Sequence, residues 1–306
     1  MTFMTRRRFI SMACASCLIA PSAHAFQWQG TALGARARII LDHPNAKGIT
    51  QRALGEISRL EDIFSLYRSH SELVQLNAAG HLEAPSFELL ECLSIARHAH
   101  RLTEGRFDPT VQPLWRVLAD AYSMGRPADD TEISAARARI GFDRVSFDSE
   151  GIRMSADQQL TLNGIAQGYI ADRIAVLMRR EGIEDVLIDT GEIIAMGAPH
   201  GQAAWPVTIA GEVKTRALTG RALATSAPFG TRLSATGQIG HILDPRHGGI
   251  LETDIRQVSV SAQNAALADA ISTGLCVAKD RNEARGLLRG DKDAVLESVQ
   301  TMADAI

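Results

Sequence analysis

Cysteine is scarce in this chain and shows no disulfide-forming pattern. Only four of the 306 residues are cysteine, and two of them, Cys14 and Cys17, lie near the N-terminus. The other two, Cys92 and Cys276, are far apart and lie in apolar segments with helical periodicity. A disulfide framework needs several cysteines in a short chain. We therefore expect Cys92 and Cys276 to be buried free thiols.

Strong net charge and internal repeats are also lacking. The formal net charge is -3, and no basic segment is interleaved with aromatic residues, so nothing indicates a nucleic-acid partner. The absence of repeats excludes a solenoid. The pattern G-x-S-x-G is absent as well, so a Ser-His-Asp triad is not indicated. With 45% hydrophobic residues, the chain can bury a sizeable core in one large domain or two closely packed ones.

The first 25 residues show the features of a bacterial twin-arginine export signal, in the correct order. Thr5-Arg6-Arg7-Arg8-Phe9-Ile10 fits the pattern S/T-R-R-x-F-L/I, and an apolar stretch and the cleavage site Ala23-His24-Ala25 follow. The apolar stretch is too short to span a bilayer as a stable helix. We predict a signal peptide over residues 1–25, a mature domain over residues 26–306 with no membrane span, and a periplasmic location.

Two other interpretations of this N-terminal segment remain. A basic, disordered start would account for the arginines but not for the apolar stretch and cleavage site that follow them. Lipid attachment at Cys14 or Cys17 would give a lipoprotein, although the apolar segment before either residue is brief for that purpose.

Helices and strands are mixed without a regular alternation, which predicts an α+β fold with antiparallel or mixed sheets flanked by helices. The segment 105–115 contains Pro109 and Pro113 and is predicted to be an ordered loop. Helical periodicity covers residues 50–64, 71–76, 132–140, 165–180, 265–277 and 282–288, with a further helix from Ser86 that ends at Gly105. Strands are expected at residues 36–41, 145–147, 152–154, 186–188, 193–196, 205–209, 222–225, 240–243 and 257–260.

The segment 160–173 is a candidate phosphate-binding connection. Leu160-Thr161-Leu162 is expected to be a short strand, a turn containing Gly164 follows, and an amphipathic helix then begins. Such a turn brings backbone groups close to a helix N-terminus, where the helix dipole favours anions. Many α/β connections have this form. The assignment of a phosphate site here therefore depends on which other side chains the fold brings beside this turn.

A second cluster of oxygen atoms lies near residue 270. Asp269, Ser272 and Thr273 fall on one face of the helix predicted there. A carboxylate and a hydroxyl four residues apart suit Mg²⁺, which takes few protein oxygens and keeps water or substrate phosphate. The alternative is a solvated Asp269, with Thr273 bonding its own helix backbone.

Two further residues have both a structural and a functional interpretation. His241, just before the Asp244-Pro245 turn, could be a structural histidine or, beside a metal-phosphate site, a general base. Tyr67, where the first helix ends, could be an amphipathic tyrosine at the edge of the core or a residue that contacts a ligand.

Taken together, these stretches resemble the ApbE family, the FAD:protein FMN transferases. They occur in the family's order and cover nearly the whole mature chain. The matching segments are Leu33-Gly34-Ala35, Phe64-Ser65-Leu66-Tyr67-Arg68 with Ser71-Glu72-Leu73 and Leu76-Asn77, Gly105-Arg106-Phe107-Asp108-Pro109-Thr110-Val111, Leu160 to Arg173, His241-Ile242-Leu243-Asp244-Pro245-Arg246, and Ala268-Asp269-Ala270-Ile271-Ser272-Thr273.

The resemblance implies Mg²⁺-dependent transfer of FMN from FAD to a threonine of a target flavoprotein, with release of AMP. It places the metal on the Gly164 carbonyl, the Asp269 carboxylate and the Thr273 hydroxyl, with Ser272 where some members have an additional ligand. His241 would be the base for the threonine hydroxyl. The FAD contacts implied by position are Leu33, Tyr67, Arg106, Phe107, Asp108, Thr161, Gln167 and Leu243.

This sequence departs from the family pattern at several positions. Thr161 stands where Asp is common, and Gln167 where Lys or Glu is common. Leu33-Gly34-Ala35 replaces M-G-T, and Gly191-Glu192-Ile193 replaces G-G-D. The last form, with the export signal, resembles the NosX branch, which is associated with nitrous oxide reductase maturation, so a target in nitrous oxide respiration is expected.

Two other functions on the same scaffold stay open at this point. The changes at Thr161 and Gln167 would favour a non-catalytic FAD-binding or carrier protein. An FAD pyrophosphatase, with water in place of threonine, would release free FMN and AMP.

Overall fold

The computed structural model describes residues 25–32, 35–233, 239–248 and 251–305. The predicted export signal, apart from Ala25, lies outside the described residues, and so does Leu33. In the described part of the chain, no helix is both long enough and apolar enough to cross a membrane.

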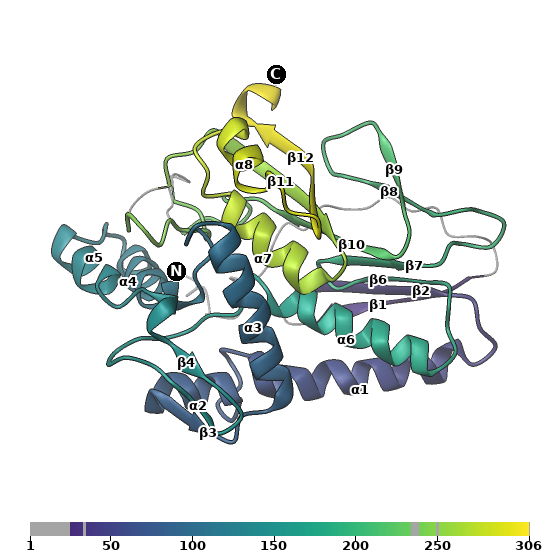
Figure 1. The fold of residues 1–306 in the computed structure, drawn as a ribbon, viewed down its shortest axis with the longest axis horizontal. Coiled ribbons are helices and arrows are strands. Elements are labelled where there is room, and N and C mark those ends of the chain that lie inside the picture. The colour runs from purple at the N-terminus through teal and green to yellow at the C-terminus, as the bar shows by residue number, and fades with distance from the viewer. Residues whose placement is uncertain (1–24, 33–34, 234–238, 249–250, 306) are drawn as a thin grey trace.

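A seven-stranded sheet forms the centre of the fold (Figure 1), and each neighbouring pair of strands in it is antiparallel. Along the sheet, the strands follow the order β1 (Phe26–Ala32), β2 (Ala35–Leu41), β6 (Val186–Asp189), β7 (Ile193–Met196), β10 (Arg221–Ser226), β11 (Ile255–Ala262) and β12 (Ala294–Thr301).

The middle of this sheet is covered on both faces. Successive side chains of a strand point to opposite faces, and in β7 Ile194 and Met196 belong to the main core while Ile193 and Ala195 belong to a second apolar cluster. Every residue of β7 is buried for this reason. The second cluster includes Trp205, Val207 and Leu218 of the hairpin formed by β8 (Trp205–Thr208) and β9 (Thr215–Leu218).

Helices cover the main-core face. Helices α6 (Ala166–Arg180) and α7 (Ala265–Leu275) pack on the sheet, α1 (Ala46–Phe64) packs on α6 and on the edge strand β1, and α3 (Phe87–Leu102) packs on α7 (Figure 1). The Asp172 carboxylate on α6 accepts hydrogen bonds from the backbone N–H groups of Ala265 and Ala266, at 2.8 and 2.9 Å. This contact ties the start of α7 to α6.

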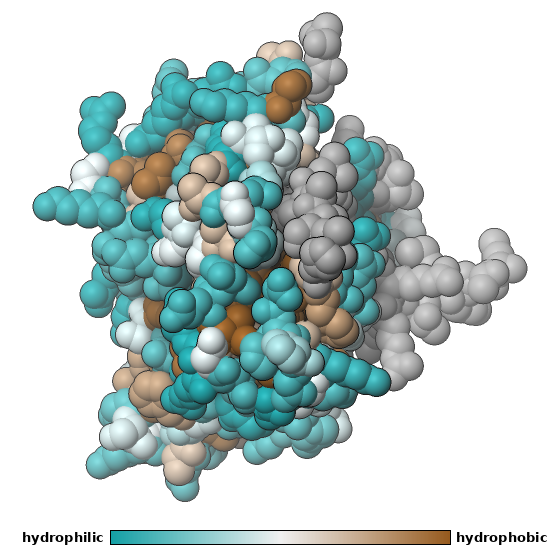
Figure 2. Space-filling model, turned by 90° about the vertical axis from the view of Figure 1, so that its right-hand side faces the viewer, coloured by the Kyte–Doolittle hydropathy of each residue, from teal (hydrophilic) through white to brown (hydrophobic). Residues whose placement is uncertain are grey.

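The remaining elements surround this core. Helices α4 (Gln112–Ser123) and α5 (Asp130–Arg137) lie at the end of the molecule opposite the β8–β9 hairpin (Figure 1). On the face shown in Figure 2, hydrophilic residues predominate, and hydrophobic ones show mainly between them. The elements around the core are the helices α2 (Glu72–Ala79), α4 (Gln112–Ser123), α5 (Asp130–Arg137) and α8 (Arg281–Leu287). They also include the small sheet of β3 (His81–Glu83), β5 (Gly151–Arg153) and β4 (Ser146–Phe147), and 3-10 turns at Pro109–Val111, Phe142–Arg144 and Met302–Ala305.

The predicted α+β class is confirmed, but three local predictions are wrong. Residues 160–162 do not form a strand, because the Asn77 side chain bonds both the N–H and the C=O of Leu160. The expected loop 105–115 contains a 3-10 turn and the start of α4, since a proline is tolerated in the first turn of a helix. Residues 240–243 form only an isolated bridge, between Gly240 and Arg232.

Candidate functional site

A deep, open cavity lies where the turn before α6, the face of α7 and the end of β10 meet. The space inside it and at its mouth, open solvent included, is about 1180 Å³. Among the described residues, every predicted site residue except Gln167 and Ser272 lines it. The lining residues are Tyr67, Arg106, Phe107, Asp108, Pro109, Val111, Gln112, Trp115, Thr161, Asn163, Gly164, Glu192, Thr225, Ser226, Ala227, Gly230, His241, Ile242, Leu243, Pro245, Asp269 and Thr273.

Gly164 and Thr273 lie against each other although 109 residues separate them. A Cβ built on Gly164 would lie 3.0 Å from Thr273 Oγ1 and 3.1 Å from its methyl carbon, so any larger residue would press on that hydroxyl. The fold therefore brings the turn before α6 and the Asp269–Thr273 face of α7 together at one wall of the cavity.

Two buried carboxyl groups face this wall. Asp269 and Glu192 are each 3% exposed, and no basic side chain forms an ion pair with either among the described residues. Burial, with Asp172 nearby, raises the pKa of Asp269 to about 8. Burial and the negative charge of Asp269 raise the pKa of Glu192 well above its usual range. Two such groups lose charge in a buried site unless a cation compensates them.

The donor set fits Mg²⁺. Asp269 and Thr273 offer hard oxygen atoms from one helix face, and the Gly164 backbone lies beside them. Within the described ranges, no three His, Cys, Asp or Glu side chains converge as a metal cage. A cation here would thus rely on few protein ligands, as is usual for Mg²⁺ bound with substrate phosphate.

His241 lines the same cavity, and its ring is held by Thr231. Its Nδ1 lies 3.3 Å from both the N–H and the C=O of Thr231. Burial lowers the pKa of His241 below 6.5, so the imidazole is neutral at neutral pH. When Nδ1 donates to the Thr231 carbonyl, Nε2 carries a lone pair and can accept a proton.

Tyr67 gives the mouth of the cavity an aromatic surface. It follows the end of α1 and is 56% exposed, while Phe107 and Leu243 in the same cavity are buried. Trp115 on α4 also lines the cavity. Exposed aromatic rings at the mouth of a pocket are suited to stacking on a planar ligand.

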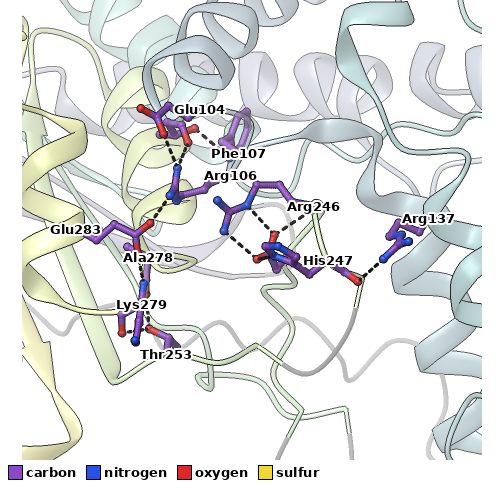
Figure 3. Close-up of polar contacts among 12 residues, drawn as sticks. Glu104, Arg106, Phe107, Arg137, Arg246, His247, Thr253, Ala278, Lys279 and Glu283 are labelled. Carbon is purple, nitrogen blue, oxygen red and sulfur yellow. Dashed lines mark hydrogen bonds and ion pairs between the residues drawn. The ribbon is translucent and has the colours of Figure 1, made fainter. Parts of the chain in front are cut away.

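Arg106 and Asp108 line the cavity, but their polar atoms are largely engaged within the protein. The Arg106 guanidinium is paired with Glu283 and, at 3.2 Å, with Glu104. Figure 3 shows these two carboxylates approaching Arg106 from opposite sides. The Asp108 carboxylate accepts hydrogen bonds from the backbone N–H groups of Thr110 and Phe142, at 2.7 and 3.1 Å.

Ion pairs continue along this part of the rim. Arg246 bonds the Asp244 carboxylate at 2.9 Å, and Arg137 donates to the His247 carbonyl at 3.0 Å (Figure 3). The arginines of this region therefore stabilise the loops around the site.

Gln167, on the first turn of α6, is not brought into the cavity. It is 3% exposed, and neither polar atom of its side chain has a hydrogen-bond partner in the part of the chain that the structure describes. The geometry gives no support to its predicted contact with FAD.

Ser226 and Glu192 line the cavity but are not among the residues predicted for the site. Ser226 ends β10, and its hydroxyl reaches both Ser272 and Thr273. In the sequence, Glu192 is noted only as a departure from G-G-D, although acidic residues in the short connection between the apolar strands 186–188 and 193–196 are a signal that could have indicated a buried carboxylate.

A model of the ApbE family matches residues 31–296. This protein belongs to the ApbE family. It is 30% identical to the FAD:protein FMN transferase of Vibrio cholerae over 253 residues, which are 76% of this chain and 74% of the relative. It is 27% identical to an enzyme of the same name from Klebsiella pneumoniae over 236 residues, 70% of each chain.

Solved ApbE structures share the fold. The apo flavinyl transferase ApbE of Pseudomonas stutzeri superposes with a TM-score of 0.78 at 24% identity, covering 90% of this chain and 92% of that one. The ApbE protein of Thermotoga maritima gives a TM-score of 0.79 at 24% identity over 90% and 96% of the chains. The resemblance seen in the sequence is thereby confirmed at the level of family and fold.

In this ApbE protein, Thr161 does not supply a charge to the cavity. Its backbone N–H donates to the Pro109 carbonyl at 2.8 Å, and its hydroxyl accepts from the Asn163 N–H at 3.3 Å. The residue therefore stabilises the turn that carries Gly164.

Proposed function

We propose that this protein transfers FMN from FAD to a threonine hydroxyl of a target flavoprotein and releases AMP. The observation that carries the proposal is the convergence of Asp269, Thr273 and Gly164 with a neutral His241 on one cavity. The ApbE membership and the relatives named FAD:protein FMN transferase support the same function.

The bond changes balance without a further reactant. The threonine oxygen attacks the phosphorus on the riboflavin side of the FAD pyrophosphate. A new phosphoester bond forms, the bond between that phosphorus and the bridging oxygen breaks, and AMP leaves with the oxygen. The proton of the threonine hydroxyl passes to a base in the cavity.

His241 fits the role of this base. Threonine hydroxyl is a poor nucleophile at neutral pH, so the step needs a neutral acceptor beside it. The lowered pKa keeps His241 unprotonated, and the contact of Nδ1 with Thr231 holds the ring. We assign Nε2 as the atom that accepts the proton.

Asp269, Thr273 and the Gly164 carbonyl would hold Mg²⁺, and the buried carboxyl group of Glu192 lines the same cavity. When bound, Mg²⁺ neutralises charge on the phosphate oxygens and orients them for in-line attack. The FAD contacts assigned to Tyr67 and Phe107 are at the aromatic part of the cavity, which suits a planar ring of the dinucleotide.

The cellular setting is part of the proposal. The twin-arginine pattern in residues 5–10 favours export to the bacterial periplasm, where the target would be a flavoprotein facing that compartment. The form Gly191-Glu192-Ile193 is the reason for placing that target in nitrous oxide respiration.

One experiment separates this function from its rivals. The mature chain is incubated with FAD, Mg²⁺ and a threonine-bearing flavoprotein domain, and the denatured target is examined for covalent flavin fluorescence and for a mass increase equal to FMN minus water. A target with that threonine replaced by valine is the matched control.

Labelling of the threonine target alone, with one AMP per flavin bound, is the expected result. Free FMN and AMP without labelling would identify a pyrophosphatase instead. Unchanged FAD after binding would identify a carrier and overturn the catalytic proposal.

A further inference from the structure

Three hydroxyl groups and one carbonyl form a continuous chain behind the cavity wall. Thr273 Oγ1 lies 3.2 Å from Ser226 Oγ, which lies 2.7 Å from Ser272 Oγ. Ser272 Oγ in turn lies 3.0 Å from the backbone carbonyl oxygen of Asp269. Ser272 is fully buried, whereas Thr273 and Ser226 line the cavity.

Counting protons fixes the direction of this chain. A carbonyl oxygen only accepts, so the Ser272 hydroxyl donates its single proton to the Asp269 carbonyl. Ser272 must then accept from Ser226, which uses the one proton of Ser226. Ser226 then has no proton left to donate to Thr273. The contact between Ser226 Oγ and Thr273 Oγ1 is therefore a hydrogen bond only if Thr273 donates. This is the one arrangement in which all three contacts are hydrogen bonds.

The arrangement has a consequence for the cavity. The Thr273 proton is directed toward Ser226, so the lone pairs of Oγ1 are left for a ligand in the cavity. A hydroxyl that presents lone pairs binds a cation or accepts a hydrogen bond. The Asp269 carboxylate on the same helix face favours the cation.

We propose that Ser226 and Ser272 are positioning residues that orient the Thr273 hydroxyl as a ligand for a divalent cation. The inference rests on the proposed function for its cation. It also changes the role expected of Ser272: its buried hydroxyl lies between the Asp269 carbonyl of α7 and Ser226 at the end of β10, so it acts through Ser226 and is not itself a ligand.

The test is cation affinity. Mn²⁺ is titrated calorimetrically into the mature protein, with and without FAD, for the wild type and for Ser226→Ala, Ser272→Ala and Thr273→Val. Loss of one buried hydrogen bond that orients a ligand is expected to weaken Mn²⁺ binding about tenfold in Ser226→Ala. Ser272→Ala should weaken it by a smaller factor, because Ser226 regains a proton that it can donate toward Thr273.

The double variant gives the sharpest readout. If Ser226 acts through Thr273, then Ser226→Ala adds no further loss of Mn²⁺ affinity once Thr273 is Val. Ser261→Ala is the control, since Ser261 on β11 is about as buried as Ser272 and its hydroxyl bonds Glu297 and Arg221 outside the cavity. Circular dichroism melting of each variant checks that the fold is retained.

Unchanged Mn²⁺ affinity in both serine variants, or equal and additive losses in the double variant, would overturn the inference, as would a wild-type protein that does not bind Mn²⁺. Wild-type binding that depends on Ser226 together with no transfer of FMN to any threonine target would leave the positioning role standing and remove the proposed function. If Ser226→Ala does not fold, the Mn²⁺ affinities of Ser272→Ala, Thr273→Val and the variant that combines them still decide the result: Ser272→Ala should weaken binding alone but add no loss once residue 273 is Val.

Discussion

Gly168 on α6 faces the main-chain carbonyl of Ala265 at the start of α7. A Cβ built on Gly168 would lie 2.3 Å from that carbonyl oxygen and 2.7 Å from the Ala266 nitrogen. The two helices can therefore cross this closely only because residue 168 lacks a side chain. The same crossing lets the Gly168 N–H reach the Asp269 carboxylate, at 3.4 Å.

Gly168→Ala should destabilise the fold by about 1–3 kcal/mol, because the methyl group would force α6 and α7 apart. Gly286→Ala on α8 is the matched control: a Cβ there meets nothing within 4 Å, and stability should stay unchanged or rise slightly. Urea unfolding of both variants measures the difference. Equal stability of the two would show that the helices can adjust without cost.

Cation binding should release protons. Because burial raises the pKa of Asp269 to about 8, its carboxyl group is protonated in the metal-free protein at pH 7 and must lose the proton to bind Mg²⁺. The apparent affinity should thus increase with pH up to about 8. Calorimetry in two buffers of different ionisation enthalpy counts the protons.

Asp269→Asn should bind Mg²⁺ and transfer FMN at least about 100-fold less well. A variant with full Mg²⁺-dependent activity would exclude Asp269 as a ligand.

The transfer rate should fall at acid pH, because His241 is then protonated and cannot accept a proton; we call this part of the pH profile the acid limb. Its pKa is lowered from 6.5 by burial, so the neutral, proton-accepting form gains population as pH rises through a value below 6.5 and is complete at neutral pH. Single-turnover transfer at saturating Mg²⁺ should rise along this limb and then level off. His241→Ala should lower the rate about 100-fold or more and remove the limb while FAD affinity is retained. Equal losses in rate and in FAD affinity would argue for a binding role.

Tyr67→Ala should raise the Kd for FAD by about tenfold or less, in line with the loss of one aromatic stacking contact. Phe87→Ala is the control, because Phe87 is an exposed aromatic residue, 66% accessible, that does not line the cavity. Fluorescence titration with FAD measures both. If the two variants bind FAD equally well, Tyr67 is an edge-of-core residue, as its sequence context alone would allow.

Export should depend on the arginine pair. Replacing Arg6 and Arg7 by lysine in the full chain is expected to keep the protein in the cytoplasm of a bacterial host that has the twin-arginine route. Fractionation of the cells, with the unmodified chain beside it, measures the change. Normal periplasmic recovery of the double variant would contradict the predicted signal.

The sequence by itself determined the family, the fold class and most of the local elements. Helix boundaries could be read because they depend on nearby residues: Ser71 and Ser86 cap α2 and α3 with their own hydroxyls, as N-cap residues do. The oxygen-bearing face of α7 could be predicted for the same reason, since spacing within one helix fixes which side chains share a side.

Only the tertiary structure decided what those elements contact. Residues 160–162 have the pattern of a strand, yet the Asn77 side chain satisfies the backbone of Leu160, a partner 83 residues away that no local pattern reveals. Gln167 belongs to a matching motif but is buried beside the cavity wall. The Ser226–Ser272–Thr273 chain likewise exists only because β10 ends against α7, and the direction of its hydrogen bonds follows from contacts between segments, not from the order of residues.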